Sequence, residues 1–172
     1  MDETVGRLLA AVEKAGVADN TIIVFTRDNG GERFSETWPF VGQKGEVLEG
    51  GIRVPLHVRW PKAIKPGSTS DQMMASMDFL PTLLSMAGGS VAKAGTFDGL
   101  DLSAQLTGQA APVERALFWR FNANTQAAVR KGDWKYVKLG GKEMLFNLAE
   151  DVRERANRAQ AKPQMLAELK QL

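Results

Sequence analysis

A run of β-branched and apolar residues, Thr21–Thr26, constrains the fold more than any other stretch of this chain. The run has no polar alternation, which is typical of a strand that is buried on both faces. One residue later come Asp28, Asn29, Gly30 and Gly31. In open α/β sheets, ligand sites form beyond the carboxyl ends of strands, because the loops diverge there. The stretch therefore predicts an α/β sheet with polar site residues just past one strand.

The segments around this strand predict the rest of an αβ layer. Apolar residues at helical spacing predict a helix that starts near Asp2 and ends near Gly16, where glycine suits the end of a helix. A second strand is predicted over Val54–Trp60. Asp78 can cap a further helix whose first turn accommodates a proline.

The last third of the chain contains short strand-like runs separated by Asn-rich, Gly-Asp and Gly-Gly turns. This spacing predicts an antiparallel sheet. The alternation over Asp133–Lys138 predicts that one face of the sheet lies in water. A final helix that carries Met165, Leu166, Leu169 and Leu172 is expected to cover the other face. The runs are Ala116–Phe121, Gln126–Lys131, Trp134–Leu139 and Met144–Leu148.

The expected fold class is α/β, with a partial αβ layer followed by a small antiparallel four-stranded sheet and a C-terminal helix. Residues 1–87 form the α/β part in this interpretation. Residues 88–112, rich in Gly, Ala and Ser, form a linker, and residues 113–172 form a small α+β subdomain.

Composition excludes several classes of function. With 44% hydrophobic and 24% charged residues the chain has the composition of an ordinary globular protein. A net charge of +2 without a basic block argues against a nucleic-acid partner. No apolar run approaches the roughly 20 residues of a membrane helix. The absence of cysteine excludes disulfides and thiolate chemistry.

Asp28 and Asn29 allow two interpretations. Asn-Gly is a strong signal for a hairpin turn, but the residues after Gly31 lack the alternation of a returning strand. Alternatively, a carboxylate and an amide oxygen at a strand end supply two hard oxygen ligands of the kind that Ca²⁺ or Mg²⁺ takes.

Several longer strings resemble the sulfatase family of the alkaline phosphatase superfamily. They are TRDNGG, GQKGEVLEGGIRVP, LHVRWP, MDFLPTLLSMAG and KGDWKYVK…MLFNLAED. The likeness covers nearly the whole chain, but only as the carboxyl-terminal portion of a family member. It implies an alkaline-phosphatase-like αβ layer. It also implies that Asp28 and Asn29 bind a divalent cation, usually calcium, together with acidic ligands from an amino-terminal half.

The resemblance further implies that Lys44 contacts the oxygens of a sulfate ester, where an ammonium offsets charge on the leaving oxygen. Glu49 and Arg53 lie in a string specific to the family, and they are interpreted as ordering the loop, although sequence alone does not separate this role from chemistry. Arg27 could add positive charge near the pocket. His57, the only histidine, is interpreted as structural, since the family does not place its catalytic histidine there.

Sulfatases act through a formylglycine made in a C/S-x-P-x-R motif, and this sequence contains no such string. The expectation is therefore a truncated sulfatase-like protein that is inactive alone, so that its status as an enzyme is left open. Ca²⁺ binding is expected to be weak or absent, and the expected ligand is a sulfate ester or another small anion.

The alternative is a non-catalytic binding module or oligomeric assembly module derived from a sulfatase. A homo-oligomer is expected in either case, because one edge of the Thr21–Thr26 strand would lack a neighbour.

Overall fold

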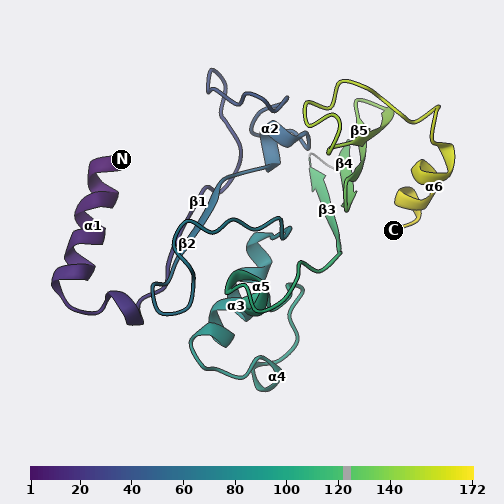
Figure 1. The fold of residues 1–172 in the computed structure, drawn as a ribbon. Coiled ribbons are helices and arrows are strands. Elements are labelled where there is room, and N and C mark those ends of the chain that lie inside the picture. Colours follow the sequence, from purple (N-terminus) through teal and green to yellow (C-terminus); the bar gives the residue numbers. More distant parts are fainter. Residues whose placement is uncertain (122–124) are drawn as a thin grey trace. The chain divides into compact units, whose positions relative to one another are not determined.

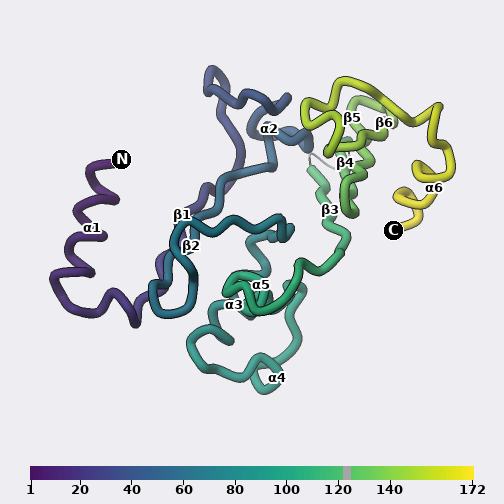
Figure 2. Tube along the Cα trace, viewed as in Figure 1, coloured from purple at the N-terminus to yellow at the C-terminus, as the bar shows by residue number. Residues whose placement is uncertain are grey.

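The computed structural model describes residues 1–121 and 125–172 (Figures 1 and 2). The chain forms two compact units. The first contains Met1–Phe25 and Leu56–Val113, and the second contains Thr26–Pro55 and Glu114–Leu172. The candidate site residues Asp28, Asn29 and Lys44 all belong to the second unit. The division into residues 1–87, 88–112 and 113–172 stays a prediction.

The first unit contains mostly short helices and a two-stranded sheet, β1-β2. As expected, the first helix is followed by Gly16, which has a φ of 69°. None of the residues of this helix is buried. The elements are α1 (Asp2–Lys14), η1 (Ala18–Asn20), β1 (Ile23–Thr26), β2 (Leu56–Arg59), η2 (Ser76–Asp78), α3 (Phe79–Met86), α4 (Val91–Ala94) and α5 (Ser103–Leu106).

Both predicted strands are shorter in the structure. Thr21 lies outside β1 because it ends the preceding turn, where its hydroxyl donates to the carbonyl of Val17 at 2.8 Å. The expectation that this strand is buried on both faces is wrong, since its residues are only half-buried and Phe25 is 38% exposed. Among the described residues, β1 pairs only with β2. One neighbour leaves much of the strand accessible.

Asp78 occupies the predicted N-cap position of α3, but its side chain makes no capping hydrogen bond to that helix. Its carboxylate accepts hydrogen bonds from the backbone N–H groups of Ala75 at 2.7 Å and Leu100 at 2.8 Å. Thr82 in α3 also bonds to the backbone of Leu100 and Leu102. Leu102 is fully buried, so these side chains fasten the segment before α5 to α3.

The second unit contains the predicted four-stranded antiparallel sheet, in the order β3-β4-β5-β6. Its first three strands have the predicted bounds, whereas the fourth starts and ends earlier than expected. The Asn-rich turn between the first two strands falls on residues 122–124, outside the described residues. The elements are α2 (Glu49–Ile52), β3 (Ala116–Phe121), β4 (Gln126–Lys131), β5 (Trp134–Leu139), β6 (Lys142–Asn147) and α6 (Pro163–Gln171).

Both faces of this sheet are covered. The strand register places Trp119, Ala128, Val137 and Met144 in one row and Phe118, Val129, Tyr136 and Leu145 in the next, on the opposite face. The first face packs against Val47 and Leu48. The second face packs against Leu169 and its neighbours in α6. The prediction of a face in water is therefore wrong, because the segment before α2 covers it. Leu172 lies beyond α6 and is exposed.

The only tyrosine of the chain, Tyr136, reports on the contact between α6 and the sheet. Its hydroxyl donates to Glu143 at 2.9 Å, and Lys170 of α6 pairs with the same carboxylate at 2.8 Å. Burial, reinforced by the hydrogen bond and charge of Glu143, raises the pKa of Tyr136 from 10.0 to about 12.

We expect an ultraviolet titration of tyrosinate to have its midpoint near pH 12 rather than 10. Between these pH values the unfolded chain loses the tyrosine proton and the folded protein keeps it, so stability should fall as pH rises through this window. In the Glu143→Gln variant the midpoint should move down towards the ordinary value. A midpoint near pH 10 in the unaltered, folded protein would show that Tyr136 is not held in this way.

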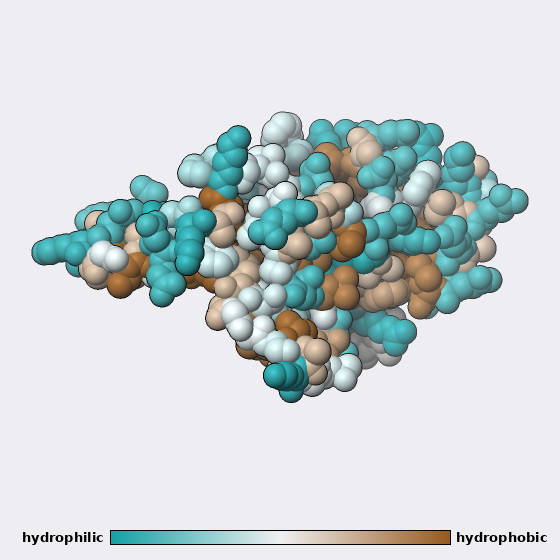
Figure 3. Space-filling view, turned by 60° about the horizontal axis from the view of Figure 1, so that its bottom comes forward, coloured by the Kyte–Doolittle hydropathy of each residue, from teal (hydrophilic) through white to brown (hydrophobic). Residues whose placement is uncertain are grey.

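The surface mixes polar and apolar residues, and on the face shown in Figure 3 the hydrophobic residues form separate patches. Exposed large apolar side chains include Leu8, Phe34 and Trp38. In the described parts of the chain, none of the helices has the length and apolar character needed to cross a membrane.

Candidate functional site

The loop that carries Asp28 and Asn29 is fastened to α2 through backbone hydrogen bonds. Gly30 N–H donates to the carbonyl of Gly51 at 2.9 Å, and Gly31 N–H donates to that of Gly50 at 3.2 Å. A Cβ atom on Gly30 would overlap the carbonyl group of Gly50. The glycines therefore permit a backbone approach that any side chain would block.

Lys44 is attached to the same loop. Its backbone N–H donates to the carbonyl of Gly31 at 2.7 Å, and its side chain is half exposed. The ammonium forms an ion pair with Glu32 at 3.3 Å. A hydrogen bond from the backbone of Arg33 and then the contact with Lys44 lower the pKa of the Glu32 carboxyl. No role was predicted for Glu32, although it follows the Asp-Asn-Gly-Gly string directly.

The predicted site residues come together in space. Asp28, Asn29 and Lys44 line one cavity of about 590 Å³. Glu32 also lines this cavity, and strand β3 supplies Trp119, Arg120 and Phe121 to its lining. A cavity with charged groups beside aromatic ones is typical of small-ligand sites. The metal-binding role of Asp28 and Asn29 and the anion-binding role of Lys44 stay predictions.

A divalent cation would find a partial set of ligands in this cavity. The Asp28 carboxylate and the Asn29 amide are hard oxygen donors, which fits calcium chemistry. Within residues 1–121 and 125–172, no group of at least three His, Cys, Asp or Glu side chains could hold a metal ion. Ca²⁺ takes about six to eight oxygen ligands, so the donors present fit the cation but do not complete its coordination.

Arg27 and His57 lie apart from the lining of this cavity. Arg27 lines a smaller hollow of about 140 Å³ together with Trp38 and Arg53. Arg27 is thus not among the residues that line the larger cavity. The His57 ring is tilted against Phe25 with 6.1 Å between ring centroids.

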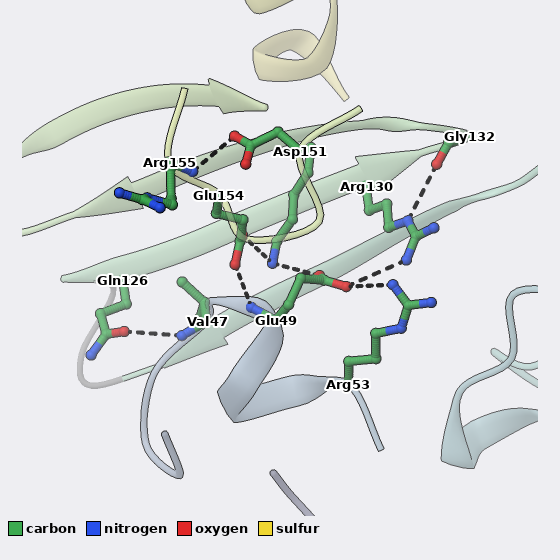
Figure 4. A network of polar contacts seen from close by, with 10 residues as sticks. Val47, Glu49, Arg53, Gln126, Arg130, Gly132, Asp151, Glu154 and Arg155 are labelled. Atoms are coloured by element: carbon green, nitrogen blue, oxygen red, sulfur yellow. Dashed lines mark hydrogen bonds and ion pairs between the residues drawn. The ribbon is translucent and has the colours of Figure 1, made fainter. Parts of the chain in front are cut away.

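Glu49 is the centre of a buried charge network (Figure 4). Its side chain is 2% exposed, and one carboxylate oxygen accepts from the ammonium of Lys135 at 2.8 Å. The other oxygen lies 3.3 Å from the guanidinium of Arg53 and 3.7 Å from that of Arg130. The interpretation that Glu49 and Arg53 order the loop agrees with this arrangement.

Glu154 is the second buried carboxylate of the network. One oxygen pairs with Lys135 at 2.8 Å, and the other accepts from the backbone N–H of Glu49 at 2.6 Å. Burial raises the pKa of the Glu154 carboxyl, and the charge of Lys135 opposes that rise. Lys135 was not predicted, because alternation along β5 indicated a solvated strand face, and no role was predicted for Glu154.

A second connection joins the loop that carries Lys44 to the four-stranded sheet. The side chain of Gln126 accepts from the backbone N–H of Val47 at 3.2 Å and donates to the carbonyl of Gly45 at 3.1 Å. The loop that carries Lys44 is therefore held by β4 as well as by β5.

The profile of the sulfatase family matches residues 1–90. This chain belongs to the sulfatase family. Its sequence is 38% identical to steryl-sulfatase of Mus musculus over 138 residues, which is 74% of this chain and 22% of that protein. It is 46% identical to an N-acetylglucosamine-6-O-sulfatase of Bacteroides thetaiotaomicron over 91 residues, 53% of this chain and 16% of the relative.

Solved structures agree on the fold of this sulfatase-family chain. The crystal structure of Ps i-CgsB superposes with a TM-score of 0.89 at 29% sequence identity, over 98% of this chain and 39% of that one. The PsFucS1 sulfatase from Pseudoalteromonas sp. superposes with a TM-score of 0.83 at 25% sequence identity, over 99% of this chain and 39% of that one. These likenesses confirm the predicted fold class. The chain spans about a quarter of the length of the curated relatives that it matches. The family relationship implies a metal cofactor in general.

Proposed function

We propose that this chain supplies the carboxyl-terminal part of a sulfatase active site and binds sulfate esters or related small anions. Asp28 and Asn29 would provide oxygen ligands to a divalent cation, and Lys44 would contact the sulfate group. The observation that carries the proposal is that these three side chains line one cavity in a chain of the sulfatase family.

The residues of this cavity suit a sulfate ester in two ways. The Lys44 ammonium can offset the negative charge that develops on the leaving oxygen. The aromatic side chains of Trp119 and Phe121, on the β3 side of the cavity, offer apolar surface to the organic part of the ester. Binding of the anion would compete with Glu32 for Lys44, since Glu32 is its ion-pair partner.

We further propose that this chain does not hydrolyse sulfate esters by itself. Its sequence contains no cysteine and no C/S-x-P-x-R string from which a formylglycine could be made. An activated and positioned nucleophile contributes many orders of magnitude to such a reaction. The cavity therefore supplies charge and orientation, whereas the covalent step requires groups that these residues do not provide.

Calcium would supply further positive charge for the sulfate oxygens when it is bound. Asp28 and Asn29 would hold it, and we expect weak binding because two side chains cannot replace most of the water around the ion. Acidic ligands from other parts of a longer sulfatase would complete the coordination.

Turnover and anion binding test the proposal. Purified chain should release no nitrophenol from 4-nitrophenyl sulfate with or without Ca²⁺, and calorimetry should detect weak sulfate binding that Lys44→Ala abolishes. Lys142→Ala, which removes an exposed lysine at the start of β6, is the matched control and should bind sulfate normally. Turnover above that of the Lys44→Ala variant would contradict the predicted inactivity. Sulfate binding that survives in that variant would exclude the role of Lys44.

The second expected partner is another copy of this chain. Among the described residues β1 pairs with β2 alone, and exposed strand edges invite pairing with other chains. We propose a two-fold dimer through this edge, with no nucleic-acid or membrane partner. Light scattering at high concentration should give the mass of a dimer, and a uniform monomer would contradict this proposal.

A further inference from the structure

We infer that Lys135 is a positioning residue for the cavity that Asp28, Asn29 and Lys44 line. In this inference β5 holds α2 in place through the Lys135–Glu49 ion pair, and α2 in turn holds the loop that carries the site residues. Only the expected effect on anion binding rests on the proposed function.

The first link is the ion pair itself. The side chain of Lys135 is fully buried, and its ammonium lies 2.8 Å from a carboxylate oxygen of both Glu49 and Glu154. Glu154 also accepts the backbone N–H of Glu49 at 2.6 Å. Glu49 is therefore held twice. Its side chain pairs directly with the Lys135 ammonium, and its backbone N–H bonds to Glu154, which pairs with the same ammonium.

The second link runs from α2 to the site through main-chain groups. Glu49 is the first residue of α2, and the carbonyls of Gly50 and Gly51 accept the N–H groups of Gly31 and Gly30. The carbonyl of Gly31 then accepts the N–H of Lys44 at 2.7 Å. Asp28 and Asn29 immediately precede these glycines. Asp28 and Asn29 therefore lie within two residues of a bond to α2, and Lys44 is bonded to Gly31, which is itself bonded to α2.

A lysine is needed at position 135 because the two carboxylates around it have little access to water. Without the ammonium, two buried negative charges would face each other, and buried charges are stable only when they are paired. Arg53 and Arg130 approach the other oxygen of Glu49, whereas Lys135 is the cation that joins Glu49 to Glu154. Loss of the ammonium should therefore displace α2 locally, while Gln126 still connects the preceding residues to β4.

The test compares Lys135→Met with Lys138→Met, which removes an exposed lysine from the same strand. Amide hydrogen exchange by NMR should be measured at Gly30, Gly31 and Lys44. The amide of Leu145, bonded to Asn157 at 3.0 Å, serves as a reference in the same unit. In Lys135→Met the exchange rates of the three site amides should rise at least about tenfold more than that of Leu145, and sulfate affinity should fall by about tenfold. Lys138→Met should change neither.

A purely structural role for Lys135 would raise exchange at all four amides equally, and that outcome would overturn the inference. If Lys135→Met does not fold, the double variant Lys135→Met/Glu154→Gln removes one of the two buried carboxylates as well. It should fold and still show rapid exchange at the three site amides, whereas protection equal to that of the unaltered protein would again overturn the inference. Absence of sulfate binding in the unaltered protein would contradict the proposed function alone, because the exchange measurement does not depend on it.

Discussion

Replacement of Gly30 by alanine is expected to destabilise the protein by about 3 kcal/mol or more, at or above the upper end of the usual cost of overpacking. The new methyl group would overlap the carbonyl of Gly50 and lie 2.8 Å from the carbonyl carbon of Gly51. These are main-chain atoms, which cannot move away as the end of a flexible side chain can. Chemical denaturation should show the loss, and binding of sulfate should weaken because the adjacent Gly31 carbonyl holds the backbone of Lys44.

Gly6→Ala is the matched control for this substitution. Gly6 lies inside α1, and a Cβ atom there would meet nothing within 4 Å. Alanine in a helix interior is more favourable than glycine by about 0.5–1 kcal/mol, so this variant should be slightly more stable. If Gly30→Ala proved as stable as the unaltered protein, the close approach between the loop and α2 would be refuted.

Replacement of Glu49 by alanine is expected to cost about 3–5 kcal/mol, because it breaks a buried ion pair and leaves the other partner buried. Lys135 would keep only Glu154 as a counter-charge, and Arg130 would lose a carboxylate at 3.7 Å. A loss of this size is a large part of the roughly 5–15 kcal/mol that stabilises most domains. The free energy of unfolding from urea titration measures it.

Glu32→Ala is the control for this experiment. It also removes a carboxylate that forms an ion pair with a lysine, in this case Lys44. Both Glu32 and Lys44 are more than half exposed, and exposed ion pairs contribute only about 0–1 kcal/mol. The two substitutions should therefore differ several-fold in cost. Equal costs would mean that Glu49 is accessible to water in solution.

Local sequence patterns predicted the small sheet well. Strands β3, β4 and β5 have the predicted bounds, because β-branched and aromatic runs were separated by residues that favour turns. Local patterns predicted the bounds of the first strand less well. Thr21 fits the apolar pattern, but its hydroxyl donates to the carbonyl of Val17. Asp78 takes its predicted position at the start of α3, but the partners of its side chain were not predicted, because one of them, Leu100, lies 22 residues away in the chain.

The sequence by itself determined the family, the fold class and the identity of the candidate site residues Asp28, Asn29 and Lys44, because each lies in a short continuous string. Only the tertiary structure decided what surrounds them. The alternation along β5 indicates a solvated face for Lys135, yet the side chain is fully buried. The reason is that its partners, Glu49 and Glu154, come from segments far away in the chain. Pairing between a buried charge and distant partners leaves no periodic signal in the residues beside it.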